Sequence, residues 1–266
     1  MLDTYSGATS VIFIVGDPIA QVKAPAFATR TLRARGADAV VVPAHVRPAD
    51  LAAFMDVASR MPNVDGVIAT VPHKFAIARL CHATSARAAS IGAVNIVRRD
   101  ARGRWFGDMC DGQGYVTALR KAGCEPACRR ALLVGAGGAG SAIAHALADA
   151  GVNALSVHDI DGARRDALLG KLATYSAMHL RVGSGDPRGF DLVINATPMG
   201  MSPSDPLPVD AGLLEPSAFV GDVVTVPEVT PLLAIARERG CPTMTGMGMF
   251  EAVRDAIVDF YLEQTT

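Results

Sequence analysis

A glycine-rich loop between a short apolar strand and an Ala-rich helix constrains the fold of this chain more than any other segment. The strand is expected at residues 131–134 and the helix at residues 141–150. The loop that joins them consists of Gly135, Ala136, Gly137, Gly138, Ala139 and Gly140. In such a loop one glycine permits a tight turn, a second lets the backbone approach a ligand, and a third lets the helix pack against the strand. The segment therefore predicts half of a doubly wound α/β sheet that binds a dinucleotide.

The polar groups around this loop indicate which dinucleotide it would hold. The free amides and the dipole at the start of the helix favour a pyrophosphate without any basic side chain. Asp159 ends the next predicted strand, where a carboxylate accepts hydrogen bonds from ribose hydroxyls and repels a 2′-phosphate. NAD is therefore the predicted cofactor, and NADP is the alternative because Arg164 and Arg165 follow on the helix. Asp159 and Asp161 could instead only cap that helix.

The rest of the chain alternates between short runs rich in Val and Ile and longer stretches with helical spacing. This alternation is typical of α/β folds, in which helices join the strands of a parallel sheet. In the first half, strands are expected at residues 11–15, 38–42 and 66–69, followed by helices that open near Pro25, Pro48 and His73, and a hairpin is expected from residues 92–98 and 104–107. In the second half, strands are expected at residues 131–134, 154–158, 180–182, 191–196 and 220–224.

The length of the chain predicts more than one domain, because 266 residues are long for a single hydrophobic core. We expect a substrate-binding domain at residues 1–107, a Rossmann-like NAD(P)-binding domain at residues 108–239, and a C-terminal segment at residues 240–266. A helix expected at residues 248–262 has a long apolar face. We expect it to pack back on the first domain.

Composition and charge exclude several classes of protein. The net charge is −1 and the apolar fraction is 50%, which excludes a nucleic-acid binder and a protein bound to a membrane surface. The five cysteines form no Cys-x-x-Cys pair, and the chain opens without an apolar leader segment. These features predict a cytoplasmic protein with reduced thiols, no disulfide and no metal.

Six motifs occur in the order typical of shikimate/quinate dehydrogenases, and the chain resembles that family over nearly its whole length. In chain order they are Val15-Gly16-Asp17-Pro18-Ile19-Ala20, Thr70-Val71-Pro72-His73-Lys74, Gly92-Ala93-Val94-Asn95, Gly107-Asp108-Met109-Cys110-Asp111-Gly112, Asn195-Ala196-Thr197-Pro198-Met199-Gly200-Met201 and Gly246-Met247-Gly248-Met249. The resemblance implies a substrate domain, a Rossmann-like domain and a C-terminal helix that returns to the first. It also implies an NAD(P)-dependent oxidoreductase of aromatic amino acid biosynthesis, acting on a small cyclic alcohol.

The resemblance implies that a lysine and an aspartate, here Lys74 and Asp111, form the acid–base pair. Hydride transfer from an alcohol carbon requires the hydroxyl proton to leave, so an acid–base group must touch that oxygen. Lys74 can exchange this proton, and Asp111 can hold the ammonium group and hydrogen-bond the substrate. The alternatives are a solvated surface lysine and a helix N-cap.

Further family positions imply contacts to substrate and cofactor. Thr70 and Asn95 match positions that contact the substrate from strand ends, although local turn hydrogen bonds would explain them equally well. Asn195, Thr197 and Met199 match positions that contact the cofactor.

The chain also departs from the family at substrate-binding positions. The family pattern Ser-x-Ser-x-Pro reads Val22-Lys23-Ala24-Pro25 here, so both serine hydroxyls are missing. Other polar family residues are replaced by Ile68, Met109-Cys110, Thr225 and Val253. A buried polar group left unpaired costs about 1–3 kcal/mol, so shikimate would bind weakly unless Lys23 or His45 replaced the lost partners. The sequence therefore predicts shikimate, quinate or a less polar cyclic analogue as substrate.

Other functions and an oligomeric state also need consideration. A dinucleotide-binding sensor without catalysis would keep the glycine loop, but the presence of both Lys74 and Asp111 favours an enzyme. An α/β-hydrolase is disfavoured because the chain has no Gly-x-Ser-x-Gly motif. An exposed edge of the first-domain sheet is compatible with a homodimer.

Overall fold

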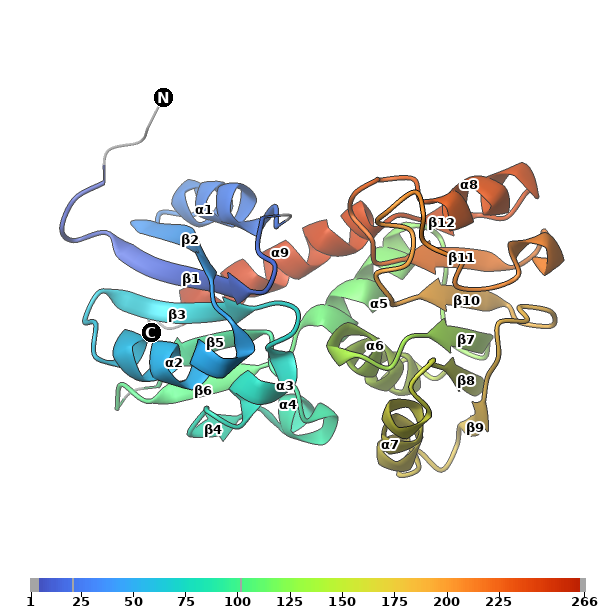
Figure 1. Cartoon of the computed structure of the whole chain (residues 1–266), viewed down its shortest axis with the longest axis horizontal. Coiled ribbons are helices and arrows are strands. Elements are labelled where there is room, and N and C mark those ends of the chain that lie inside the picture. The colour runs from blue at the N-terminus through green and yellow to red at the C-terminus, as the bar shows by residue number, and fades with distance from the viewer. Residues whose placement is uncertain (1–4, 21, 101, 264–266) are drawn as a thin grey trace. The chain divides into compact units, whose positions relative to one another are not determined.

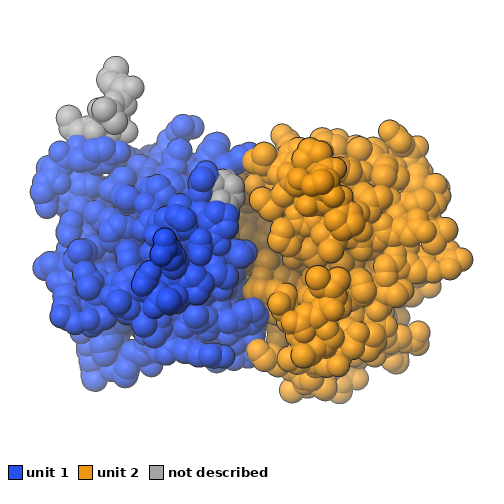
Figure 2. All heavy atoms as spheres, in the orientation of Figure 1, with its two compact units in different colours: residues 1–110, 254–266 blue, residues 111–253 orange. Residues whose placement is uncertain are grey.

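The structure, a computed structural model, describes residues 5–20, 22–100 and 102–263. The chain divides into two compact units, which Figure 2 distinguishes by colour. Unit 1 comprises Met1–Cys110 and Arg254–Thr266, and unit 2 comprises Asp111–Val253. The sequence predicted divisions after residues 107 and 239, and the roles of the two predicted domains stay predictions.

Unit 1 contains a mixed six-stranded sheet with the strand order β2-β1-β3-β5-β6-β4 (Figure 1). Its strands are β1 (Ser10–Gly16), β2 (Ala39–His45), β3 (Val64–Ala69), β4 (Ala83–Thr84), β5 (Ile96–Arg99) and β6 (Trp105–Asp108). Its helices are α1 (Ala24–Ala34), the short 3-10 helix η1 (Pro48–Asp50), α2 (Leu51–Ser59), α3 (Lys74–Ala78) and α4 (Ala86–Ile91).

The first three strands of unit 1 run parallel, because a helical segment returns the chain after each of the first two. Prolines favour the starts of α1 and η1. The proline ring presets a helical φ, and the N–H that proline lacks would have no partner in the first turn of a helix. The predicted hairpin is confirmed: β5 and β6 pair antiparallel, with Arg99 opposite Trp105. The two-residue strand β4 was not predicted, since so short a segment shows no periodicity.

Unit 2 contains a six-stranded, fully parallel sheet with the strand order β12-β11-β10-β7-β8-β9. Its strands are β7 (Arg130–Val134), β8 (Ala154–His158), β9 (His179–Val182), β10 (Leu192–Asn195), β11 (Phe219–Asp222) and β12 (Thr243–Met244). Its helices are α5 (Asp111–Lys121), α6 (Gly138–Asp149), α7 (Gly162–Leu172), the 3-10 helix η2 (Ala211–Leu213) and α8 (Pro231–Glu238). This is the predicted Rossmann-like α/β arrangement, with β12 as the strand that was not predicted.

Both faces of the unit 2 sheet are buried. Because side chains alternate along a strand, Leu133 and Ile194 join one hydrophobic cluster while Leu132 and Val193 join another. The first cluster contains buried residues of α5, α6 and α7, and the second contains buried residues of α8 and η2. Burial on both faces explains why these strands are almost purely apolar rather than alternating.

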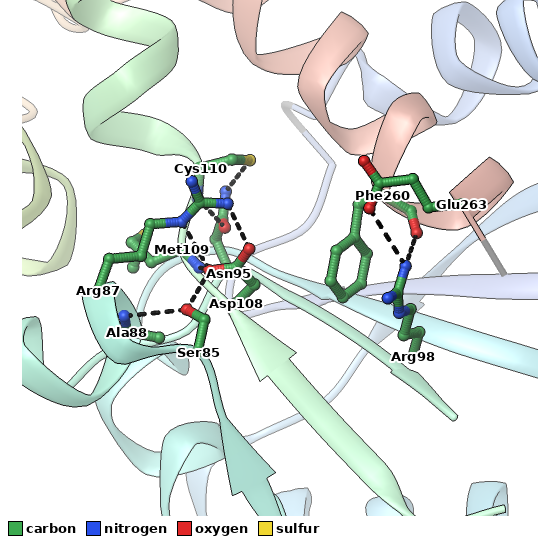
Figure 3. A network of polar contacts seen from close by, with 10 residues as sticks. All are labelled: Ser85, Arg87, Ala88, Asn95, Arg98, Asp108, Met109, Cys110, Phe260 and Glu263. Atoms are coloured by element: carbon green, nitrogen blue, oxygen red, sulfur yellow. Dashed lines mark hydrogen bonds and ion pairs between the residues drawn. The ribbon is translucent and has the colours of Figure 1, made fainter. Parts of the chain in front are cut away.

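The last helix, α9 (Gly246–Leu262), contributes to both units. Its last turns belong to unit 1, where the hydroxyl of Tyr261 donates to the carbonyl of Val97 at 3.1 Å. Arg98 lies over the ring of Phe260, 4.4 Å from its centroid, and donates to the carbonyl of Phe260 (Figure 3). The predicted return of the C-terminal helix to the N-terminal unit is confirmed.

Candidate functional site

The glycine loop follows β7 directly, and two of its glycines are required by close packing. Gly135 has a φ of 104°, and a methyl group there would lie 2.8 Å from the carbonyl oxygen of Ala196. A methyl group on Gly140 would lie 1.9 Å from the carbonyl oxygen of Gly135. Gly137 differs, because nothing lies within 4 Å of its added methyl position and it lines a pocket. The space beside Gly137 is therefore open to a ligand.

The carboxylate of Asp159 lies beside this loop, at the end of β8. Its Oδ2 accepts from the amide of Ala136 at 2.7 Å, and its Oδ1 accepts from the amide of Asp161 at 2.8 Å. Asp161 is the residue that caps α7, accepting from the amide of Arg164 at 3.1 Å. The helix-cap alternative therefore explains Asp161 but not Asp159, whose two backbone hydrogen bonds fix it against the loop.

A pocket of about 880 Å³ opens along these residues within unit 2. Among the residues predicted to bind the cofactor, its lining includes Gly135, Gly137, Asp159, Thr197 and Met199. The lining also includes Arg164, the residue behind the NADP alternative, and residues that were not predicted, among them His158, Ile160, Asp205, Leu207 and Asp210. The volume lies at the upper end of the range for small-molecule sites, which suits a ligand as large as a dinucleotide.

Asn195 shapes one wall of this pocket through a buried hydrogen-bond network. Its Oδ1 accepts from the amide and the hydroxyl of Thr197, at 3.0 and 2.6 Å. Its Nδ2 donates to the carbonyl of Met199 at 3.0 Å and to Oδ1 of Asp222 at 3.1 Å. Asn195 is 1% exposed, so it positions Thr197 and Met199, which do line the pocket.

Asp222 anchors that network from the end of β11. It is fully buried and also accepts from the hydroxyl of Thr230 at 2.7 Å and from the amide of Val224 at 2.9 Å. Burial raises the pKa of Asp222, and the hydrogen bonds from Val224, Thr230 and Asn195 offset only part of that rise. Asp222 was not predicted as a site residue, although a polar residue closing an apolar parallel strand is a usable signal.

Asp205 and Arg164 also line this pocket, and different contacts place each of them. Asp205 accepts from the amides of Gly200 and Ser202, at 3.0 and 2.9 Å, and so closes the turn after the Met199 segment. Arg164 lies on α7 with its guanidinium 3.9 Å from Asp159 and 3.4 Å from Asp161. A Ser-Pro-Ser-Asp sequence predicts such a turn, whereas the reach of Arg164 depends on tertiary packing.

In unit 1, the structure brings Thr70, Lys74 and Asn95 to neighbouring segments. Thr70 directly follows β3, and Lys74 begins α3 and is half-buried. The amide of Val94 donates to the carbonyl of Lys74 at 2.9 Å, and the amide of Ala69 donates to the carbonyl of Asn95 at 2.7 Å. The three residues predicted to act on substrate therefore stand on backbone segments that are hydrogen-bonded to one another.

Asn95 is buried and holds the end of unit 1 that leads into Asp111. Its Oδ1 accepts from the amide of Cys110 at 2.9 Å, and its Nδ2 donates to the thiol sulfur of Cys110 at 3.2 Å (Figure 3). Asp111 follows Cys110 in the chain, begins α5 and is 5% exposed. These hydrogen bonds span 15 positions of the chain, so they are not the local turn bonds expected as the alternative role of Asn95, and they fix the backbone just before Asp111.

An ion pair between buried Asp108 and half-buried Arg87 supports the same segment. Asp108 accepts from Nε of Arg87 at 2.7 Å, from a second guanidinium nitrogen of Arg87, from the hydroxyl of Ser85, and from the amide of Met109 at 2.7 Å (Figure 3). Burial raises the pKa of the Asp108 carboxyl, but the bonds from Arg87 and Ser85 outweigh it and hold that pKa below 3.8. These contacts fix the 108–110 segment and were not predicted.

The residues that replace polar family positions are mostly packed against apolar neighbours. Ile68 is 4% exposed in β3, between Ile14 and Ile96. Val253 lies against Gly114, where an added methyl group would be 2.4 Å from Val253 Cγ2. At the start of α1 no side chain caps the helix. The side chains of Ile68 and Val253 are therefore apolar at positions where the family pattern has a polar substrate contact.

The described residues contain neither a metal-site cluster nor a membrane-spanning helix. Across residues 5–20, 22–100 and 102–263, no cluster of three or more His, Cys, Asp or Glu side chains has the arrangement of a metal site. No helix in the described part of the chain has the length and apolar character needed to cross a membrane.

Comparisons with known proteins place the chain among similar sequences and structures. A family model described as the shikimate dehydrogenase substrate binding domain matches residues 14–97. An NADP(+) shikimate dehydrogenase from Rhodospirillum rubrum is 37% identical, with 92% of this chain and 88% of the relative covered.

Two solved structures resemble this one closely. A shikimate 5-dehydrogenase from Listeria monocytogenes, in complex with shikimate and NAD, has a TM-score of 0.88 at 27% identity and covers 99% of this chain and 95% of its own. A ligand-free 5-ketofructose reductase from a Gluconobacter strain has a TM-score of 0.84 at 29% identity and covers 96% of this chain and 93% of its own.

Proposed function

The chain belongs to the shikimate dehydrogenase family of oxidoreductases, and we propose that it transfers a hydride between a nicotinamide dinucleotide and a ring hydroxyl or ketone of shikimate, quinate or a less polar cyclic analogue. The observation that carries this proposal is the combination of an open, glycine-lined pocket in unit 2 with Thr70, Lys74 and Asn95 on joined segments of unit 1.

The residues of unit 2 fit a dinucleotide. The open space beside Gly137 leaves room for a pyrophosphate, and the amides at the start of α6 and its dipole favour that anion. Asn195 holds Thr197 and Met199 in the pocket wall. When bound, the nicotinamide supplies the hydride acceptor or donor of the reaction.

We assign NAD as the preferred cofactor, with NADP as the alternative. A 2′-phosphate would be repelled by Asp159, whose carboxylate is fixed by the amides of Ala136 and Asp161. Arg164 is the nearest cation among the pocket-lining residues, but it lies within 4 Å of both Asp159 and Asp161, which offset its charge. The Rhodospirillum rubrum relative is named for NADP(+), so this assignment rests on Asp159 rather than on relatives.

Lys74 and Asp111 are assigned the proton transfer. In the oxidation direction, the hydride leaves the alcohol carbon and the hydroxyl proton passes to Nζ of Lys74; in reduction the proton returns to the new oxygen. Asp111 supplies a carboxylate that holds the ammonium group and accepts a substrate hydrogen bond. Asn95 and Thr70 are assigned substrate contacts, which the fixed backbone at Cys110 and at the end of β3 supports.

The test is an initial-rate measurement with shikimate and quinate, each with NAD and NADP. Lys74→Ala is expected to lower kcat by about 100-fold or more, the range for loss of an acid–base group, without changing dinucleotide affinity. Lys171→Ala, on the exposed side of α7, is the matched control and should keep full activity. Dinucleotide binding without any turnover would instead support the non-catalytic sensor.

A second candidate substrate class is an uncharged hydroxyketone. The observation that favours it is the structural likeness to a 5-ketofructose reductase, together with Val22 and Ala24 at the positions of the two family serines. In that case the same residues of unit 2 and the same Lys74 would act on a ketone that has no carboxylate beside it.

A further inference from the structure

We propose that Asp17 and His45 form a specificity-determining pair that selects an uncharged, hydroxyl-bearing substrate over a carboxylate. This inference rests on the proposed function, because it concerns the same substrate site. Neither residue was predicted to take this role, and His45 was expected at most to bind a substrate carboxylate.

The pair stands at the carboxyl ends of two adjacent parallel strands. Nε2 of His45, the last residue of β2, lies 2.6 Å from Oδ1 of Asp17, which directly follows β1. The strands pair in register, with Gly16 opposite His45. The side chain of Asp17 is 34% exposed and that of His45 is 55% exposed, so a ligand can reach both.

The pair lies next to the segment that carries Thr70 and Lys74. The amide of Asp17 donates to the carbonyl of Val71 at 3.0 Å. A methyl group added to Gly16 would lie 2.5 Å from Cγ2 of Thr70, so Thr70 packs directly over the residue before Asp17. The ends of β2, β1 and β3 therefore present His45, Asp17 and Thr70 side by side.

A buried histidine joins the end of β2 to the segment after β3. His73, which is 1% exposed, hydrogen-bonds through Nε2 to the carbonyl of Val46 at 2.7 Å. Val46 follows His45, and His73 precedes Lys74. The position of the Asp17–His45 pair is therefore tied to the residue assigned to proton transfer.

The chemistry of the pair favours hydroxyl groups. A carboxylate has about four acceptor positions, and His45 engages one oxygen, so Asp17 can still accept from substrate hydroxyls. A substrate carboxylate at this edge would meet a like charge. Nε2 of His45 is already bound to Asp17, so that nitrogen is not available to a substrate carboxylate.

The residues around the start of α1 lack the two hydroxyls that the family pattern places there. Val22 and Ala24 stand where the family pattern has serines, and no side chain caps the start of α1. Lys23, the residue just before α1, is a nearby cation that could attract a carboxylate. The experiment therefore includes it.

The test compares two ligands that differ by one negative charge and one methyl group, shikimate and its methyl ester. Binding of each is measured by calorimetry or ligand-observed NMR in the presence of NADH, with wild type, Asp17→Asn and Lys23→Ala. Wild type is expected to bind the ester about fivefold more tightly, the upper range for a partly exposed charge, and Asp17→Asn should bring the two affinities within about twofold. Asp56→Asn, an exposed carboxylate on α2, is the matched control and should leave the ratio unchanged.

Measuring the turnover of both ligands distinguishes a failure of this inference from a failure of the proposed function. If neither is turned over but the ester still binds more tightly in an Asp17-dependent way, the inference stands and the proposed activity fails. If shikimate is preferred and turned over, the activity stands and the inference is overturned. A shikimate preference that Lys23→Ala removes would assign carboxylate binding to Lys23, and failure of both ligands to bind would also overturn the inference.

Discussion

The carboxylate of Asp159 accepts a hydrogen bond from the amide of Ala136, with 2.7 Å between Oδ2 and the nitrogen. This bond joins the end of β8 to the middle of the glycine loop. The carboxylate that would bind the ribose hydroxyls is therefore held by the loop backbone that would bind the phosphates. A change at Asp159 should alter both the cofactor preference and the geometry of the loop.

Replacing Asp159 with serine should shift the cofactor preference toward NADP. The substitution removes a like charge from the place of a 2′-phosphate and leaves Arg164 with only Asp161 as a nearby carboxylate. We expect the ratio of NADPH to NADH affinity to rise about tenfold, measured by fluorescence titration. Asp166→Ser, at an exposed carboxylate of α7 that pairs with Arg165 rather than with Arg164, should leave the ratio unchanged. An unchanged ratio in Asp159→Ser would exclude Asp159 as the selecting residue.

Replacing Asn195 with aspartate should destabilise unit 2 in a pH-dependent way. The new carboxylate would stand where the Asn195 amide now donates to Asp222 at 3.1 Å, and two buried carboxylates cannot both ionise at that distance. Burial already raises the pKa of Asp222 above 3.8, and a second carboxylate would raise it further. A raised folded-state pKa stabilises at low pH and loses that contribution as pH rises.

The measurement is the free energy of unfolding of Asn195→Asp and wild type at pH 5 and pH 8. We expect the deficit of the variant to be larger at pH 8. Asn153→Asp, at an exposed position before β8, is the matched control and should show no such dependence. Equal deficits at both pH values would mean that the pair does not share a buried environment.

Most of the fold could be predicted from the sequence, because its main signals are local. Runs of Val and Ile marked the long strands, and the loop after β7 was recognisable because Gly135 and Gly140 have neighbours that leave no room for a side chain. The two-residue strands β4 and β12 were missed, since each is defined by its partner strand rather than by its own periodicity.

Site residues could be predicted from the sequence only where a chemically suitable side chain lies next to a local sequence signal, such as the end of a strand. Asp159 follows a strand and Lys74 follows a strand end with a Val-Pro pair, so both could be proposed from the sequence, and their roles stay predictions. Asp17 and His45 lie 28 positions apart and meet only because β1 and β2 pair in register. The same holds for Asn195 and Asp222, which come together across two strands. The sequence of one segment alone does not specify which residue of another strand it will pair with.

Replacing Gly66 with alanine should destabilise unit 1. The added methyl would lie 2.3 Å from Cε1 of Tyr261 and 2.4 Å from the carbonyl oxygen of Val97, so the ring that closes the C-terminal helix onto β3 would have to move. Overpacking of this kind costs about 1–3 kcal/mol, or roughly 2–4 °C in Tm per kcal/mol for a chain of this size. Gly7→Ala, with nothing within 4 Å, is the control and should leave Tm unchanged. An equal Tm for both variants would contradict the packing of Tyr261 on Gly66.

The stability of unit 2 should fall as pH decreases, in part because of His145. This residue is 3% exposed in α6, its Nδ1 lies 3.4 Å from the hydroxyl of Tyr175, and its Nε2 has no hydrogen-bond partner among the described residues. Burial lowers the pKa of His145 below 6.5. The unfolded chain therefore takes up a proton near pH 6.5 that the folded chain resists, so stability is full above that pH and declines as pH falls below it.

The check is the free energy of unfolding of wild type and His145→Gln between pH 7.5 and pH 5. His145→Gln cannot be protonated, so we expect a shallower decline than in wild type, even if its stability at pH 7.5 is lower. His179→Gln, at an exposed position on β9, is the matched control and should keep the wild-type slope. Identical slopes for wild type and His145→Gln would mean that protonation of His145 does not lower the free energy of unfolding. The T-shaped contact of its ring with Tyr175, 5.8 Å between centroids, would then have to open as the proton binds.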